Sequence, residues 1–367
     1  MFDKVAGSHA GSIVLFGSGA LGLRALKGLR SLNIEPVAFT DNSPNLWNRS
    51  VYGLKVLPPL EAVQRFSDKA VFVVTIYNGS AVRQQLKEMN CTMVVPFAYL
   101  FWRYAETFLP YCALDFPHSI YTEAESVERA FSLWADEKSK QEYVAQLRWR
   151  LLLDFDSLPA HRPAHEMYFP TDLISFRNDE VFMDCGSFDG DVVRTFLQLR
   201  GDKFRNIIAL EPDPDNFRKL RKYVFTLEDG LRSKIILREA AAAAQEGRLR
   251  FDSTGTVTSS AGASGKIEVE GLPLCRILPD AEPTYVKMDI EGAEMDALIG
   301  ARDLIKKCAS AWAICLYHQQ GHLWQVPLFM QSVSDQYDFF LRRYAEECWE
   351  LVCYAVPKRR RITNEKG

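Results

Sequence analysis

Two segments of this chain place a glycine-containing loop between a short apolar run and a helical pattern, and this repeated transition limits the possible folds more than any other feature. The runs are residues 13–16, which are wholly apolar, and 181–185, which are apolar except for Asp184. A buried strand, a glycine turn and a helix in succession are typical of a parallel sheet with helices on its faces. Because 367 residues exceed the usual size of one core, we predict two such α/β domains.

The first predicted domain, residues 1–100, alternates strand-like and helical segments. Its strand-like runs are 13–16, 37–40 and 71–76, and its helical patterns are 21–32 and 81–89. This alternation predicts a small Rossmann-like parallel sheet. Residues 101–170 are aromatic-rich and proline-broken, with a long helical stretch at 123–153, and they predict a helical connector.

The second predicted domain, residues 171–357, begins a new strand and helix series. Strands are expected at 181–185, 207–210, 234–238, 284–288 and 311–317, and helices at 191–199, 215–225 and 293–305. Two last runs, 337–344 and 348–356, predict a closing antiparallel hairpin. The basic residues from Lys358 to Arg361 open a segment, 358–367, that we expect to be a polar tail.

Composition argues against nucleic-acid and membrane partners and does not identify any other partner. The formal net charge is -3, too small to attract nucleic acid or an anionic membrane. The first ten residues do not resemble a secretory signal, and uninterrupted apolar runs of ~18 residues are missing. We therefore expect a cytoplasmic protein without nucleic-acid or membrane partners, and homo-oligomer formation is left open.

The first glycine loop contains Gly17, Gly19 and Gly22 and opens a helix. Glycines there let a phosphate approach backbone N–H groups at the helix start, and Asp41, after the next strand, is placed to hold a ribose hydroxyl. The loop is a possible second nucleotide site. The alternative is that its glycines only form a tight turn.

The second glycine loop, from Asp184 to Gly190, is flanked by acids that a pyrophosphate would avoid and a cationic sulfonium would favour. The next predicted strand is followed by Glu211, Pro212 and Asp213. A carboxylate at that position can accept hydrogen bonds from both ribose hydroxyls of an adenosine. The alternative is that Glu211 caps the helix that follows Pro214.

Four motifs in this order carry a family resemblance. They are residues 184–190, 211–214, 285–294 (YVKMDIEGAE) and 311–318 (AWAICLYH). Over residues 180–357 the chain resembles the FkbM family of methyltransferases, although Phe188, Asp189 and His322 depart from the common pattern. The resemblance implies a class I methyltransferase sheet and methyl transfer from S-adenosyl-L-methionine to an oxygen, commonly on a sugar, glycan or polyketide. The expected partner is therefore a small-molecule or carbohydrate acceptor.

The candidate cofactor-binding residues surround the first three strand ends of the second domain. They are Asp184, Cys185, Gly186, Ser187, Phe188, Gly190, Glu211, Pro212, Glu239 and Ala240.

The candidate catalytic residues are His318, Asp289 and Glu291, which follow the fourth and fifth predicted strands of this domain. Methyl transfer to a hydroxyl requires removal of its proton, and an imidazole that titrates near neutrality can act as the base. His318 can instead be a structural histidine, and Glu291 can cap the following helix. The same three residues can hold a divalent metal, although we expect none. Ser259 and Ser260 are candidates for the acceptor pocket.

A second hypothesis belongs to a different functional class. In it the chain is a nucleotide-sugar or dinucleotide-binding module that works through the loop from Gly17 to Gly22, and the second domain is a scaffold. The two hypotheses predict different ligands, because only the first requires Glu211 to bind an adenosine.

Overall fold

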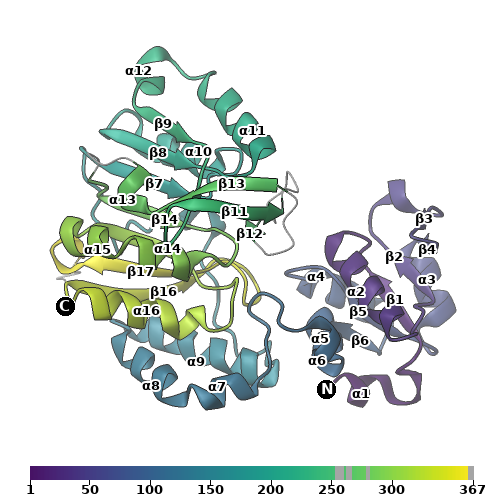
Figure 1. The fold of residues 1–367 in the computed structure, drawn as a ribbon. Helices are drawn as coiled ribbons and strands as arrows, with labels where there is room; N and C mark the ends of the chain where they lie inside the picture. The colour runs from purple at the N-terminus through teal and green to yellow at the C-terminus, as the bar shows by residue number, and fades with distance from the viewer. Residues whose placement is uncertain (253–259, 262–266, 278–281, 363–367) are drawn as a thin grey trace. The chain divides into compact units, whose positions relative to one another are not determined.

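The computed structural model describes residues 1–252, 260–261, 267–277 and 282–362 (Figure 1). The chain forms two compact units. Unit 1 comprises Met1–Ser119 and Arg148–Ser157, and unit 2 comprises Ile120–Leu147 and Leu158–Gly367. None of the helices in the described ranges is both long and apolar enough to cross a membrane.

Unit 1 is built on a six-stranded sheet in the order β3-β4-β2-β1-β5-β6. All neighbours pair in parallel except β3 and β4. Strands β1 and β5 are apolar and buried along their whole length, as expected of a sheet with covered faces. This confirms the first Rossmann-like domain. The strands are β1 (Ile13–Phe16), β2 (Ala38–Thr40), β3 (Ser50–Val51), β4 (Leu54–Leu57), β5 (Val71–Val74) and β6 (Val94–Pro96).

The helices of unit 1 are α1 (Phe2–Ala6), η1 (Gly7–His9), α2 (Ala20–Ser31), η2 (Pro44–Leu46), α3 (Pro59–Phe66), α4 (Ser80–Glu88), α5 (Phe97–Arg103) and α6 (Ala105–Phe108). Helices α2, α3 and α4 of unit 1 lie in the connections between its parallel strands, which need such crossovers, whereas α1 and η1 precede β1.

Unit 2 is built on a seven-stranded sheet in the order β16-β17-β15-β14-β7-β8-β9. Neighbours are parallel except at β17, which is antiparallel to both β15 and β16. This confirms the predicted parallel sheet with a C-terminal antiparallel hairpin. The strands are β7 (Val181–Cys185), β8 (Asn206–Leu210), β9 (Ile235–Arg238), β14 (Tyr285–Met288), β15 (Ala311–Cys315), β16 (Tyr337–Arg343) and β17 (Leu351–Pro357).

The strand order of unit 2 determines where a ligand can bind. From β7 the chain adds β8 and β9 on one side and then crosses to add β14 and β15 on the other. The order therefore reverses between β7 and β14, and open α/β sheets bind ligands at the carboxyl ends of the strands beside such a reversal. The principal helices of this unit are α10 (Asp191–Arg200), α11 (Pro214–Val224), α12 (Asp229–Arg232), α13 (Leu274–Ile277), α14 (Glu294–Gly300), α15 (Arg302–Cys308) and α16 (His322–Val333).

Three segments of unit 2 differ from the sequence prediction. The helix expected at 293–305 is divided at Ala301 into α14 and α15. The last strand begins at Leu351, since Tyr344 and Glu350 close a longer turn through a 3.0 Å backbone hydrogen bond. A second, four-stranded sheet in the order β10-β13-β11-β12 was not predicted. Its strands are β10 (Ala241–Ala242), β11 (Gly247–Asp252), β12 (Ser260–Ala261) and β13 (Ile267–Leu272).

The predicted helical connector contains α7 (His118–Thr122), α8 (Ala124–Leu133), α9 (Glu137–Leu152) and η3 (Ala164–Glu166). The long helix expected at 123–153 is interrupted because Asp136 accepts a 2.9 Å hydrogen bond from the Ser139 amide and so caps α9. In unit 2, the Ala135 amide donates to the Phe339 carbonyl of β16, and the Leu341 amide donates to Ser139 Oγ. The start of α9 therefore lines the edge strand of the sheet.

The basic segment after β17 is only partly a polar tail. It begins with η4 (Lys358–Arg360), and Arg360 is buried. Its guanidinium lies 2.8 Å from the Glu180 carboxylate, which precedes β7. Basic composition alone indicated a solvated segment, whereas pairing with a buried acid places Arg360 inside unit 2.

Candidate cofactor and active site

The glycine loop of unit 2 connects β7 to α10 through a backbone that favours glycine. Gly186 has a φ of 82° and Gly190 a φ of 90°. The amides of Gly186 and Ser187 both donate to the Leu210 carbonyl at the end of β8, at 3.0 and 2.9 Å. A Cβ on Gly186 would lie 1.9 Å from the Asp289 carbonyl oxygen. The loop is therefore held tightly between the ends of β8 and β14.

We expect Gly186→Ala to lower the free energy of unfolding by about 2–5 kcal/mol, because it combines an unfavourable φ with a close backbone contact. Gly201→Ala is the matched control, since Gly201 also has a positive φ, 58°, but has no atom within 4 Å of the added Cβ. We expect this control to cost only about 1–2 kcal/mol. Urea unfolding of both variants measures the difference, and equal costs would contradict the contact.

Glu211 is the residue that directly follows β8, and its carboxylate reaches the glycine loop. Oε2 accepts from the Phe188 amide at 2.8 Å, and Oε1 accepts from the Asp213 amide at 2.9 Å. Burial raises the pKa of Glu211 to about 7, although both amides act to lower it. A carboxylate has about four acceptor positions, so two positions are left for a ligand with hydroxyl donors.

Glu211 does not cap the helix that follows it, so the alternative interpretation of this residue is wrong. The side chain of Asp213 caps α11, accepting from the amides of Asp215 and Asn216. Glu211 instead joins the ends of β7 and β8, where a ligand bound at the edge of the sheet would meet it.

Asp184, a predicted cofactor-binding residue, pairs with a lysine of a neighbouring strand. Its side chain is fully buried, and Oδ1 lies 3.1 Å from Lys287 Nζ on β14. Although burial alone lowers the pKa of Lys287, the charge of Asp184 raises it above its usual range, so the ammonium stays charged. Lys287 Nζ also donates to the Gly186 carbonyl at 2.7 Å. Asp184 therefore pairs with Lys287, and Lys287 in turn holds the glycine loop through the Gly186 carbonyl.

The remaining predicted cofactor residues follow or end β7, β8 and β9 in sequence. These three strands are neighbours in the sheet (Figure 1). Cys185 and Ser187 are buried, and Ser187 Oγ donates to the Asp184 carbonyl at 3.0 Å. Gly190 and Ala240 are also buried. The residues that are partly or fully exposed are Gly186, Phe188, Pro212 and Glu239.

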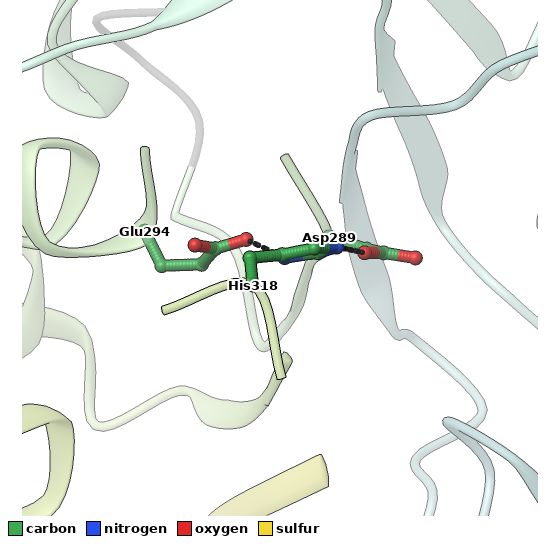
Figure 2. A group of neighbouring side chains, drawn as sticks. All are labelled: Asp289, Glu294 and His318. Carbon is green, nitrogen blue, oxygen red and sulfur yellow. Dashed lines mark hydrogen bonds and ion pairs between the residues drawn. The ribbon is translucent and has the colours of Figure 1, made fainter. Parts of the chain in front are cut away.

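The predicted catalytic residues meet at the ends of β14 and β15. His318 Nε2 lies 3.4 Å from Asp289 Oδ1 and 3.8 Å from Glu291 Oε2. Figure 2 shows the ring between Asp289 and a fourth side chain, Glu294, whose Oε1 is 2.8 Å from His318 Nδ1. The structure therefore brings together all three predicted residues and adds Glu294, which the sequence prediction missed although it lies in the quoted 285–294 motif.

The acids around His318 change its charge state. Burial disfavours the charged ring, but the ion pair and hydrogen bond with Glu294, together with Asp289 and Glu291, raise the pKa of His318 to about 10. The expected titration near neutrality is therefore wrong, and the ring is protonated at pH 7. Burial raises the pKa of Glu291 to about 7, and the charge of His318 lowers it less than burial raises it.

Two tyrosines that sequence reasoning missed complete this region. Tyr168 donates to Asp289 Oδ2 at 2.7 Å, and Tyr317 donates to Asp289 Oδ1 at 3.3 Å. Tyr317 directly precedes His318 and could have been found from the motif. Tyr168 is 121 residues from Asp289 in sequence, and no local pattern links the two. Ser259 lies outside the described residues, and Ser260 is in β12.

The ion pair predicts that stability falls with rising pH. The pKa of His318 rises from the ordinary 6.5 to about 10 on folding, so its stabilisation is complete below pH 6.5 and is lost as the pH rises towards 10. We expect the free energy of unfolding to decrease across this range, and Glu294→Gln to flatten the decrease. Urea unfolding at several pH values measures both slopes. Equal slopes in the two proteins would contradict the role of Glu294.

The glycine loop of unit 1 has a comparable arrangement. Asp41 Oδ2 accepts from the Ser18 amide and hydroxyl, both at 3.0 Å. Gly17 has a φ of 106°, and a Cβ on Gly22 would lie 2.0 Å from the Gly17 carbonyl oxygen, whereas one on Gly19 would meet open space. Gly17 and Gly22 are therefore required by the turn itself, with or without a ligand.

Comparisons with known proteins agree with this geometry. The family model described as methyltransferase FkbM domain matches residues 184–345. A search of curated protein sequences finds no match. The structure of methyltransferase FkbM from Methylobacillus flagellatus KT is similar, with a TM-score of 0.77 at 22% identity over 96% of this chain and 92% of that chain.

Two other solved structures share less of the fold. Fibrillarin from Aeropyrum pernix, solved with S-adenosyl-L-methionine, has a TM-score of 0.30 at 11% identity and covers 52% of this chain and 72% of its own. TrmK from M. capricolum, solved with S-adenosyl-homocysteine, has a TM-score of 0.31 at 11% identity and covers 52% of this chain and 67% of its own.

The family model matches residues 184–345, and the sheet order and glycine loop of unit 2 agree with it. Unit 2 therefore contains a methyltransferase domain of the FkbM family.

Proposed function

We propose that unit 2 transfers a methyl group from S-adenosyl-L-methionine to a hydroxyl oxygen on a sugar, a glycan or a polyketide-type small molecule. The observation that carries this proposal is the buried carboxylate of Glu211, which has acceptor positions to spare at the reversal point of the sheet. The family of the domain supports the same chemistry.

The residues present fit the cofactor. Glu211 would accept hydrogen bonds from the ribose hydroxyls, and Gly186 and Phe188 would line the loop beside it. Lys287 holds this loop in place through its bond to the Gly186 carbonyl. When bound, S-adenosyl-L-methionine supplies an electrophilic methyl group on a positively charged sulfur.

The acceptor would bind beside the ends of β14 and β15. Asp289 and Glu291 have side chains that are 22% and 30% exposed, so a substrate can reach them. Because His318 is protonated at neutral pH, we assign removal of the acceptor proton to these carboxylates and assign orientation of the carboxylates to His318. Alignment of acceptor and methyl group supplies the rest of the rate increase.

The first experiment is calorimetry of the purified protein with S-adenosyl-L-methionine, NAD and a UDP-sugar in separate titrations. We expect S-adenosyl-L-methionine to bind with one site per chain. Transfer of a labelled methyl group to a panel of hydroxylated sugars and polyketides then identifies the acceptor class. Failure of S-adenosyl-L-methionine to bind, with binding of either nucleotide, would overturn the proposal.

A second ligand is favoured by one observation in unit 1. Asp41 follows β2 and accepts from a glycine-loop amide, as Glu211 does after β8. We propose that this loop binds the ribose of a nucleotide sugar or dinucleotide. The same titrations test it, with Asp41→Asn expected to weaken nucleotide binding and to leave S-adenosyl-L-methionine binding unchanged. The reverse result would contradict it.

A further inference from the structure

One buried nitrogen of the candidate active site, His318 Nε2, is without a hydrogen-bond partner among the described residues. The side chain is 4% exposed, and Nε2 makes no hydrogen bond to any residue in the described part of the chain. Its neighbours are two carboxylate oxygens, Asp289 Oδ1 at 3.4 Å and Glu291 Oε2 at 3.8 Å. Nδ1, on the other side of the ring, makes a normal 2.8 Å contact with Glu294 (Figure 2).

The distances from Nε2 to the two carboxylate oxygens are too long for hydrogen bonds and fit ligands of one metal ion better. A hydrogen bond would bring nitrogen and oxygen to about 2.7–3.2 Å. Two ligands that each lie about 2.1 Å from one tetrahedral cation are about 3.4 Å apart. We propose that a divalent transition-metal ion displaces the proton from His318 Nε2 and binds between that nitrogen, Asp289 and Glu291, with its fourth position open to a water or the acceptor.

The surroundings of these three residues match those of known metal ligands. A metal-bound histidine almost always donates its other N–H to a carboxylate, and Glu294 provides that carboxylate. Glu294 is itself fixed, because Oε1 also accepts from the Ile290 amide at 3.0 Å. Carboxylates that bind metals are in turn hydrogen-bonded, and Tyr168 donates to Asp289 Oδ2 at 2.7 Å.

The donor set also selects the class of ion. One imidazole and two carboxylates suit Zn²⁺ and similar transition ions, whereas Mg²⁺ and Ca²⁺ prefer oxygen ligands alone. Three protein ligands with an open fourth position are typical of catalytic zinc sites. If the proposed methyl transfer is correct, the ion would lower the pKa of a bound acceptor hydroxyl, and the Glu291 carboxylate oxygen that does not bind the ion would accept its proton.

The test uses the full chain after treatment with a chelator, in the absence of S-adenosyl-L-methionine. Calorimetry with Zn²⁺ measures affinity and stoichiometry, and the visible absorption of bound Co²⁺ reports whether the site is tetrahedral. We expect one ion per chain. Asp289→Asn and Glu291→Gln should each weaken Zn²⁺ binding by about 100-fold, and Glu294→Gln by about 10–100-fold.

The matched control is Asp296→Asn, which removes an exposed acid from α14 and should leave Zn²⁺ affinity unchanged. A chain that binds no Zn²⁺, or one whose affinity is the same in Asp289→Asn as in Asp296→Asn, would overturn the proposal. Circular dichroism verifies that each variant is folded. If Asp289→Asn does not fold, the Zn²⁺ affinity of Glu291→Gln and the Co²⁺ spectrum of the unaltered chain test the metal site instead.

Glu211→Ala separates this proposal from the proposed reaction. This variant lacks the ribose carboxylate but keeps all the residues of the metal site, so it should still bind one Zn²⁺. Loss of Zn²⁺ binding in a folded Glu211→Ala variant would contradict an independent metal site. Zn²⁺ binding without any binding of S-adenosyl-L-methionine would leave the metal site standing and overturn the methyl-transfer proposal.

Discussion

Replacing Glu211 by alanine is expected to weaken S-adenosyl-L-methionine binding on the order of 100-fold, which corresponds to about 2.8 kcal/mol. The reason is that both ribose hydroxyls would lose their acceptor, and two hydrogen bonds to a charged group, at the lower end of the usual ~1.5–3 kcal/mol each, account for a loss of this size. Glu211→Gln keeps the shape of the side chain and one acceptor oxygen, so we expect a loss of about 10-fold. Calorimetry measures all three proteins.

The control for this experiment is Glu228→Ala, which removes an exposed acid immediately before α12. Its affinity should equal that of the unaltered chain. Because Glu211 also accepts from the Phe188 and Asp213 amides, thermal unfolding must show that Glu211→Ala is folded at the temperature of the titration. A folded Glu211→Ala variant with unchanged affinity would place the adenosine elsewhere.

Replacing Lys287 by methionine is expected to lower the free energy of unfolding by about 3–5 kcal/mol, because it leaves Asp184 buried without its counter-ion. The double variant Asp184→Val with Lys287→Met removes both charges and should recover part of the loss. Recovery should be incomplete, since the Gly186 carbonyl would still lack the donor that Lys287 provides. Urea unfolding of the single and double variants measures both effects.

A surface pair provides the comparison. Lys307 lies 3.4 Å from Glu282, and both side chains are at least 70% exposed. Lys307→Met should therefore cost no more than about 1 kcal/mol. If Lys287→Met costs as little as Lys307→Met, the buried pair of Lys287 and Asp184 does not stabilise the glycine loop.

The elements that sequence predicted best are those whose boundaries are set locally. Strands β1 and β7 begin and end where predicted, because each stops at a glycine turn and is apolar, apart from Asp184 in β7. The break between α14 and α15 has a tertiary cause. A Cβ on Gly300 would lie 2.1 Å from the Ala243 carbonyl oxygen, so the end of α14 is fitted against a distant segment that helical periodicity cannot report.

In the candidate site, too, the sequence predicted features set by neighbouring residues and missed those set by residues far away in the chain. Glu211 was predicted because an acid directly after a strand has a defined place at the edge of a sheet. The charge state of His318 was not, because it depends on burial and on Glu294 and Asp289 together. Lys287 could have been recognised, since a lysine inside an apolar central strand requires a buried anion, and Asp184 lies opposite it on β7.

The contact between α9 and β16 has a consequence for how this domain can be separated from the rest of the chain. β16 is an outer strand of its sheet, and residues 135–139 occupy part of its free side. A fragment beginning at residue 171 would lack them and expose unpaired backbone amides and carbonyls. Such an open edge is a template for pairing with a second molecule, so this fragment should aggregate while one that begins before residue 120 should not.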